Sequence, residues 1–426
     1  MPGRRKFVRT ISRGIASALL LPAFDYTDSN AHPVMPRFDS NNEENYWREI
    51  RSQFPLKKEL VFLNCATLGP SPQVVVAAEA ATNLELNTNA ALPANADALL
   101  ADIARLVKAT KQNIALTHNV TEGINIGVWS LDLHKGDEVI ISTHEHVGNA
   151  VPWLNRARID GIILKPLKLR NTAEEMFEAV KKSITPKTKV IALPHIPCTN
   201  GQVLPIAAIC NYARQKGIFT IVDGAHGPGL LQLDLPALGC DIYASCCHKW
   251  MLGPKGTGFL YVHTDSIEKL SPQFAGAYSD SGWDLLSSPP RLNGFVPTAH
   301  RFFYGTQSPT QYAGVIAAIK FIEAIGQEKI ETRARDLATY LQDQLLDMGK
   351  EKIEMLSPTE AISRGASNGY NVHKLGYKEV ANACRKEKVI IRAVPENGVD
   401  CVRVSTHIYN NKEEIDQLIN IIKTLA

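Results

Sequence analysis

Four side chains that could take part in covalent or acid–base chemistry each follow a short β-rich run of this 426-residue sequence. Asp223 closes the apolar run "IFTIVDG", and Lys249 follows "DIYAS" within "YASCCHKWMLGPKGTGFLYV". Thr121, in "NVTEGIN", opens a predicted helix after "NIALT", and His146 follows "DEVIIST". Taken singly, each has an ordinary interpretation as a helix cap, a turn residue or a solvated surface group. Because ligands of parallel sheets bind beyond the carboxyl ends of the strands, their common placement predicts one shared site.

The chemistry that fits all four side chains is that of pyridoxal 5'-phosphate. An amine can form a Schiff base with its aldehyde, and a buried carboxylate can pair with its protonated ring nitrogen. An imidazole can stack on its flat ring, and a helix N-terminus can bind its phosphate. The nucleotide-binding alternatives fail on spacing: "GAHGPG" and "GPKGTG" run G-x-x-G-x-G, and no G-x-x-x-x-G-K-[ST] occurs.

The elements that must position these residues alternate between strands and helices. Helix-length segments separate the β-rich runs, which predicts an α/β fold with a doubly wound, mainly parallel sheet of seven strands. From about residue 308, two long helical patterns precede strand-like runs and a last helix, which predicts a small α+β domain. The seven β-rich runs are 113–117, 137–143, 161–167, 188–194, 218–224, 241–245 and 258–263.

We therefore predict four parts along the chain. Residues 1–31 form an export signal, and residues 32–74 contribute to the small domain and the site. Residues 75–307 form the large cofactor-binding domain, and residues 308–426 form the small C-terminal domain.

From about residue 43 to the C-terminus, the chain resembles the class V aminotransferase family of fold-type I pyridoxal-phosphate enzymes, and in particular its isopenicillin N epimerase-like branch. The resemblance implies a small-molecule amino-group substrate and a homodimer with shared active sites. It rests on the order and spacing of several stretches, which are specific together and not singly: "LNCATLGPSP", "NVTEGIN", "EHVGNAVPW", "TNGQVLPI", "VDGAHGPG", "CHKWMLGPKGTGFL", "YGTQ" and "VRVSTHIYNNKEEID".

The resemblance also implies roles for individual residues. Lys249 is similar to the lysine that forms an aldimine with the cofactor, Asp223 to the aspartate at the pyridine nitrogen, and His146 to the ring-stacking residue. Substrate contacts are implied for Asn64 and for Arg403, whose planar guanidinium suits a carboxylate. Further cofactor contacts are implied for Val120, Thr121, His226, His248 and, from the other subunit of a dimer, Thr306.

Three cysteines depart from the family pattern. Cys246 stands where relatives often carry serine, and Cys198 where many carry asparagine. Cys401 is the cysteine of "RAVPENGVDCVR", a stretch equivalent to the loop that carries the catalytic cysteine of desulfurases. Because Cys401 lies in an apparent strand rather than on a mobile loop, this departure argues against a cysteine desulfurase.

Several activities share this set of residues. Amino-group transfer is the first expectation, with C–S lysis or epimerisation as alternatives, since each begins when the lysine amine removes the α-proton. A non-catalytic cofactor-binding protein is the hypothesis from another class. It predicts the loss of a core group, whereas Lys249, Asp223, His146 and Arg403 are all present.

Composition narrows the range of partners. Hydrophobic content of 45% and charged content of 21% are typical of soluble globular proteins. Residues 1–24 contain five basic residues and no acidic one, and without them the formal charge falls from +3 to −2, so no nucleic-acid partner is expected. The eight cysteines show no ligand spacing typical of zinc, and no metal site is expected.

The N-terminal stretch "RRKFVRTISRGIASALLLPAF" has a twin arginine, Arg4 and Arg5, before an apolar run too short to span a bilayer. It resembles a twin-arginine export signal, with a small-residue cleavage site at 29–31. We therefore expect a periplasmic protein without a membrane span. A disordered basic tail on a cytoplasmic protein, or a mitochondrial-type presequence, is the alternative.

Overall fold

A computed structural model describes residues 35–90 and 96–425, and the predicted export signal lies outside this range. At its centre is a seven-stranded sheet with the order β2-β8-β7-β6-β5-β3-β4. Neighbouring strands are parallel, except that β8 runs antiparallel to both β7 and β2. The predicted α/β fold with a mainly parallel sheet is therefore confirmed. The strands are β2 (Ile114–Thr117), β3 (Glu138–Ser142), β4 (Ile163–Leu167), β5 (Thr188–Pro194), β6 (Phe219–Asp223), β7 (Ile242–Cys246) and β8 (Gly258–Val262).

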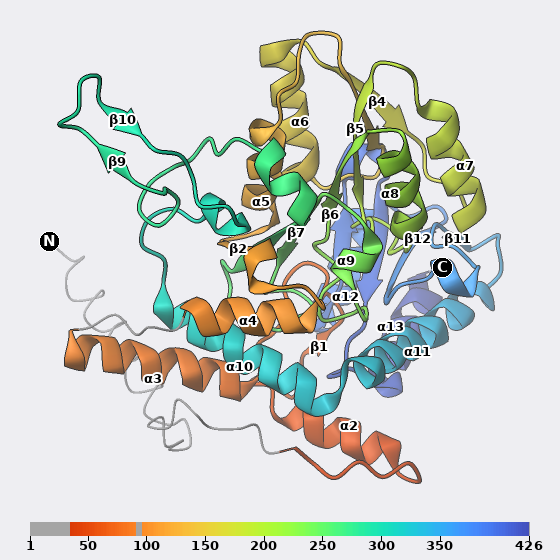
Figure 1. Cartoon of the computed structure of the whole chain (residues 1–426). Helices are drawn as coiled ribbons and strands as arrows, with labels where there is room; N and C mark the ends of the chain where they lie inside the picture. The colour runs from red at the N-terminus through yellow and green to blue at the C-terminus, as the bar shows by residue number, and fades with distance from the viewer. Residues whose placement is uncertain (1–34, 91–95, 426) are drawn as a thin grey trace, which may run out of the picture.

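Helices cover both faces of this sheet. In β3, Val139 and Ile141 pack into the same hydrophobic cluster as Trp153, whereas Ile140 packs into the cluster on the opposite face. Figure 1 shows α5 and α6 on one side of the sheet and α7 and α8 on the other. Burial on both faces explains why the inner strands are largely apolar, whereas the edge strand β4 contains Lys165 and is mostly exposed or half-buried. The helices of this part are α3 (Gln73–Asn89), α4 (Ala96–Leu106), α5 (Val120–Ser130), α6 (Val147–Asp160), α7 (Ala173–Ser183), α8 (Ile206–Gln215) and α9 (Leu235–Leu238).

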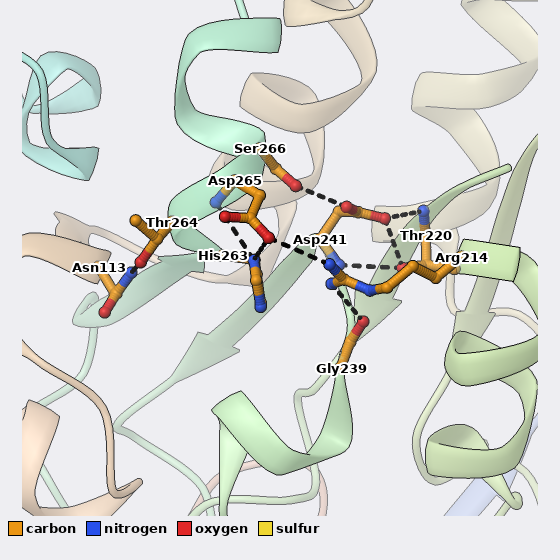
Figure 2. Close-up of polar contacts among 9 residues, drawn as sticks. All are labelled: Asn113, Arg214, Thr220, Gly239, Asp241, His263, Thr264, Asp265 and Ser266. Carbon is orange, nitrogen blue, oxygen red and sulfur yellow. Dashed lines mark hydrogen bonds and ion pairs between the residues drawn. The ribbon is translucent and has the colours of Figure 1, made fainter. Parts of the chain in front are cut away.

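The starts of β6 and β7 are tied together by the carboxylate of Asp241. It accepts hydrogen bonds from the backbone N–H and the hydroxyl of Thr220, at 2.8 and 2.9 Å, and from the hydroxyl of Ser266 (Figure 2). Because β6 and β7 are parallel, fixing their starts also fixes the relative level of their ends. Those ends lead to Asp223 and Lys249.

A second, antiparallel sheet has the order β11-β12-β15-β14. The N-terminal segment joins this region, because β1 (Val61–Phe62) pairs with β13 (Val389–Ile390) and Asn64 forms a bridge with Ser405. The domain boundaries given above stay a prediction. The remaining elements are α2 (Glu43–Ser52), α10 (Pro309–Ile325), α11 (Gln327–Leu346), β11 (Ile353–Met355), β12 (Ser367–Val372), α12 (Tyr377–Lys386), β14 (Arg392–Val394), β15 (Cys401–Ser405) and α13 (Lys412–Leu425).

A hairpin made by β9 (Trp283–Asp284) and β10 (Arg291–Leu292) stands out from the body of the molecule (Figure 1). Its apolar side chains are exposed, and Leu286 at its tip is 99% accessible. Short 3-10 helices complete the structure at Lys111–Asn113, Thr264–Lys269, Ala299–Phe302, Ala361–Ser363 and Glu396–Gly398. No helix within residues 35–90 and 96–425 has both the length and the apolar character needed to cross a membrane.

Candidate active site

A cavity of about 190 Å³ lies at the C-terminal ends of the central strands. Six of the residues predicted for the site line it: Val120, Thr121, His146, Asp223, His248 and Lys249. Ala66, Thr67, Asn119, Gly148, Ala225, Cys246 and Arg392 complete its wall. A larger groove of about 740 Å³, lined by residues of α12 and α13, contains none of these groups. The smaller cavity is therefore the candidate active site.

Asp223 brings a carboxylate to the floor of this cavity from the end of β6. The residue is buried, and its Oδ1 accepts a hydrogen bond from the backbone N–H of Ala225 at 2.9 Å. Burial raises the pKa of this carboxyl, while the Ala225 hydrogen bond and the charge of Lys249 oppose that shift. No ion pair of Asp223 occurs in the described part of the chain. A cationic group that entered the cavity would therefore meet a buried carboxylate that forms no ion pair within the described residues.

His146 is the N-cap of α6 and presents a neutral ring to the cavity. Its Nδ1 accepts a hydrogen bond from the N–H of Gly148 at 3.0 Å. Burial, together with the charges of Lys249 and Arg392, lowers the pKa of His146 to about 4. A neutral imidazole can stack on a flat ring without placing a second cation against it.

The N-termini of α5 and α6 meet at the cavity and form an anion-binding corner. Asn119 caps α5 by accepting from the N–H of Glu122 at 3.0 Å, which leaves the first N–H groups of the helix free. A Cβ atom at Gly148 would lie 2.4 Å from Thr121 Oγ1, so only glycine allows this approach. His248 adds an imidazole whose Nδ1 lies 3.2 Å from the carbonyl oxygen of Thr257.

Arg403 lies in β15 as a fully buried guanidinium. It donates to the carbonyl of Cys198 at 2.7 Å, to Asn64 Oδ1 at 3.0 Å and to Thr67 Oγ1 at 2.8 Å. Burial lowers the pKa of Arg403 to about 10, and Arg392 is the next largest cause. Asn64, predicted to contact substrate, therefore holds Arg403 through a hydrogen bond, and Thr67 connects Arg403 to the cavity wall.

Two residues of this site were not singled out from the sequence. Arg392 lines the cavity, pairs with Glu396, and is the register partner of Arg403 across the β14–β15 ladder. Glu145 is buried beside His146 and accepts from the hydroxyl of Ser142 and the amide of Asn149, both at 2.7 Å. Burial raises the pKa of Glu145 to about 8. The available signals were a strand-borne arginine and a carboxylate within "HEHVGN", and neither is distinctive.

Two predicted cofactor contacts lie outside the cavity wall. His226 is buried, and its Nδ1 accepts from the indole N–H of Trp250 at 2.9 Å. Thr306 is exposed and does not line the cavity of its own chain. Its assignment to the cofactor stays a prediction that requires a second subunit.

The three cysteines singled out above are all buried. Cys246 lines the cavity, and burial raises the pKa of its thiol to about 11. Cys401 donates to the carbonyl of Thr199 at 3.8 Å, and burial raises its pKa to about 12. Cys198 serves the site through its backbone, as an acceptor for Arg403. None of the three thiols is a ready thiolate in this conformation.

The doubly wound sheet, with a lysine, a buried carboxylate and a helix-end anion site at its strand ends, defines a fold-type I pyridoxal-phosphate enzyme. The particular family follows from comparison with known proteins. The chain belongs to the class-V aminotransferase family, since the "Aminotransferase class-V" family model matches residues 78–418.

Two named relatives cover most of the chain. The isopenicillin N epimerase of Streptomyces clavuligerus is 30% identical over 398 residues, which are 89% of this chain and 98% of that protein. A Xylella fastidiosa protein named "Probable cysteine desulfurase" is 29% identical over 405 residues, which are 88% of this chain and 94% of that protein.

Solved structures give the same relationship. The complex of the cystine C–S lyase C-DES with its reaction product cysteine persulfide is similar with a TM-score of 0.79 and 26% identity, over 87% of this chain and 99% of that chain. Another C-DES structure, with a TM-score of 0.80, holds glycine covalently linked to the PLP cofactor. The predicted cofactor, pyridoxal 5'-phosphate, is thereby confirmed for the family and its fold.

The inference that argued against a cysteine desulfurase is wrong. Cysteine desulfurases are among the chain's relatives, at 29% identity in the example above, and among its structural neighbours. The inference failed because it gave decisive weight to the position of Cys401.

The residues present fit the cofactor. Asp223 offers a buried carboxylate without a cationic partner in the described chain, and His226 Nε2 is a buried ring nitrogen without a hydrogen bond there. The α5 N-terminus and the glycine at 148 leave an anion-binding corner in the same cavity as Lys249. Lys249, Asp223, His146, Val120, Thr121 and His248 would hold the group.

Proposed function

We propose that this chain is a pyridoxal-phosphate enzyme that cleaves the C–S bond of a cysteine-type α-amino acid. The observation that carries the amino-acid part is Arg403, a fully buried guanidinium that donates to neutral oxygens beside the cavity. A substrate carboxylate is the anion that such a fork suits. The C–S part is supported by the cystine C–S lyase at 26% identity and the "Probable cysteine desulfurase" at 29%.

The cofactor, when bound, supplies an aldehyde carbon for the substrate amine and an electron-withdrawing ring next to the α-carbon. Lys249 would supply the amine that attaches the group, and the same amine would be the base that takes the α-proton. Asp223 would be the acidic partner of the ring nitrogen, and His146, which is neutral, would be the residue that packs against the ring. Arg403 orients the substrate carboxylate, so the α-proton can face Lys249 and the β-sulfur can leave.

Product analysis of the purified holoenzyme tests this proposal. With L-cystine, β-elimination should release cysteine persulfide, pyruvate and ammonia, and with L-cysteine it should release sulfide, pyruvate and ammonia. Desulfuration of L-cysteine would instead give alanine and pass the sulfur atom to an added thiol as a persulfide, which excess dithiothreitol reduces to sulfide. The Lys249→Ala variant should release neither sulfide nor persulfide, and it should lose the aldehyde-type absorption that depends on a lysine linkage. Absence of sulfur release from both substrates would overturn the proposal, and accumulation of the pyridoxamine form would instead indicate transamination.

Epimerisation is the second candidate. The observation in its favour is the 30% identity to isopenicillin N epimerase, which extends over 98% of that protein. The same purified enzyme should then convert an L-amino acid or a peptide-linked amino acid to its D-form without loss of sulfur. Chiral chromatography of the recovered substrate distinguishes this outcome from lysis. A holoenzyme that releases no product at all would favour the non-catalytic hypothesis.

We also propose export to the periplasm through the segment that contains Arg4 and Arg5. The twin arginine and the short apolar run that follows support this proposal. A full chain with both arginines changed to lysine should remain in the cytoplasm. Unchanged export of that variant would contradict the proposed signal.

A further inference from the structure

His226 has a buried ring nitrogen whose partner is missing from the described part of the chain. Its Nδ1 accepts a hydrogen bond from the indole N–H of Trp250 at 2.9 Å, and its Nε2 is buried without a hydrogen bond. An indole N–H can donate and cannot accept. His226 Nδ1 must therefore carry a lone pair toward Trp250 and not a proton.

The imidazole of His226 is neutral. Burial is the main cause that lowers its pKa well below the ordinary value, and the charges of Lys249, Arg403 and Arg392 act in the same direction. A neutral imidazole that is unprotonated at Nδ1 carries its one proton at Nε2. The unpartnered atom is therefore an N–H donor.

Trp250 is fixed from its other side by His407. The indole stacks on the His407 ring with centroids 5.5 Å apart. The backbone carbonyl oxygen of Trp250 lies 3.0 Å from His407 Nε2. His407 Nδ1 accepts from the backbone N–H of Ile408, which leaves its Nε2 proton for the Trp250 carbonyl. The backbone of Gly229 also passes so close that a Cβ there would lie 2.4 Å from the Trp250 carbonyl carbon. The direction of the indole N–H is thus set by packing on several sides.

The donor at His226 Nε2 fits an acceptor that arrives with a ligand. His226 and Asp223 lie in the same turn after β6, and Asp223 faces the cavity that contains Lys249. Pyridoxal 5'-phosphate carries an anionic ring oxygen next to the carbon that reacts with an amine. A buried N–H favours such an oxygen because both groups are removed from water.

We propose that Trp250 is a positioning residue that holds His226 as its Nε2–H tautomer, so that His226 donates to the anionic ring oxygen of the cofactor. The inference rests on the proposed function insofar as that function requires the cofactor. A merely structural Trp250 would stabilise the fold and leave both the tautomer and the cofactor's titration unchanged.

The tautomer can be measured without the cofactor. In ¹⁵N-histidine-labelled cofactor-free protein, long-range ¹H–¹⁵N spectra distinguish protonated from unprotonated ring nitrogens, and loss of one ring's signals in His226→Gln assigns this residue. We expect wild-type His226 to be protonated at Nε2 alone from pH 6 to 8. Trp250→Phe should give a mixture of tautomers or a protonated ring. Trp153→Phe is the matched control, because Trp153 is also fully buried and its indole N–H lacks a partner within the described chain.

The consequence for the cofactor is measured by its absorbance as a function of pH. An anionic oxygen that loses a hydrogen bond binds a proton more tightly. The pH midpoint of the cofactor's absorbance change should therefore rise by about one pH unit in Trp250→Phe, in which His226 is no longer held as a donor. Trp153→Phe should not shift it. In the His226→Gln background the second change to Trp250→Phe should have little effect, because an amide N–H can donate without a tautomer lock.

Each outcome bears on a separate claim. Two results would overturn the inference: a wild-type His226 that is protonated at Nδ1, and equal absorbance midpoints for Trp250→Phe and Trp153→Phe. The first result needs the wild type alone, so it decides the matter even if Trp250→Phe folds poorly. A chain that does not bind the cofactor would overturn the inference and the proposed function together. A locked tautomer and a shifted midpoint without sulfur release would leave the inference standing and overturn the proposed function alone.

Discussion

At the scale of single residues, Asp223 offers the sharpest test because it is a buried carboxylate without a cationic partner in the described chain. Asp223→Asn keeps the shape and removes the charge, so we expect kcat/KM to fall roughly 100-fold or more. Asp241→Asn is the matched control, since Asp241 lies at the opposite end of the same strands (Figure 2). It should lower the melting temperature and leave kcat within about twofold, because the β6–β7 ladder still sets the register of the strand ends. Equal losses of activity in the two variants would contradict a role for Asp223 in the reaction.

Glu145 predicts a pH dependence of stability. Its pKa is raised to about 8 by burial, so from pH 6.5 to 8 the folded protein holds a proton that the unfolded chain has released. The contribution of Glu145 to stability should therefore fall as pH rises through this window. Histidines whose pKa values are lowered to about 4, such as His146, His195 and His407, oppose this trend near pH 6.5, because the unfolded chain still binds part of a proton at each of them. The contribution of Glu145 is therefore read from the difference between a variant and the wild type.

Denaturant unfolding of the cofactor-free protein at pH 6.5 and pH 8 measures this effect. The loss of stability should be about 2 kcal/mol smaller in Glu145→Gln than in the wild type. Glu59→Gln, at an exposed position, is the control and should keep the wild-type difference. A wild-type pH dependence in Glu145→Gln would show that Glu145 does not bind the proton.

The sequence predicted the site residues that belong to strand ends and failed for those that depend on register. Asp223 and Lys249 could be proposed because each follows an apolar run, and both line the cavity. Arg392 could not, because only the antiparallel pairing of β14 with β15 places it opposite Arg403. The hydrogen bond from Trp250 to His226 joins residues 24 positions apart, and no sequence pattern indicates such a contact.

At the scale of elements, the sequence predicted where the strands lie along the chain but not their order in the sheet. The predicted run 188–194 coincides with β5, because an apolar segment between two helices is best buried as a strand inside the sheet. The run predicted from 161 begins later, at Ile163, because Gly161 is the left-handed C-cap of α6. Strand order depends on crossovers between distant segments, and the local pattern of apolar and polar residues does not predict it.

The approach of α5 to α6 gives the prediction that belongs to this scale. In Gly148→Ala the new methyl would lie 2.4 Å from Thr121 Oγ1 and 3.1 Å from His146 Nδ1, so the two helix ends must separate. We expect affinity for pyridoxal 5'-phosphate to fall about 10-fold in an absorbance titration. Gly376→Ala is the control, since no atom lies within 4 Å of its added Cβ. Equal affinities in the two variants would mean that the corner does not bind the phosphate.

At the scale of the whole molecule, two features favour a second copy of the chain as the partner. The hairpin of β9 and β10 exposes the large apolar side chains of Trp283, Leu285 and Leu286 at 65, 68 and 99%, and neighbouring exposed apolar groups of this kind are typical of interaction surfaces. Thr306 is exposed and lies outside the cavity of its own chain, as expected if it completes the cavity of a partner. Both features are accounted for if the hairpin packs on the other subunit.

Sedimentation tests this arrangement, and we expect a mass about twice the 46.8 kDa of the chain. Leu286→Glu should shift the equilibrium toward monomer, because a charge is costly in an apolar contact. Loss of the dimer should also weaken binding of the cofactor's phosphate, because it removes the partner's Thr306 from the cavity. Ile362→Glu, at a 72% exposed position, is the control and should stay dimeric. If Leu286→Glu remains dimeric, the hairpin is not the contact, and a monomeric wild type would exclude the shared active site. A dimer that dissociates in Leu286→Glu yet binds the cofactor with wild-type affinity would separate assembly from the site and leave Thr306 without the proposed role.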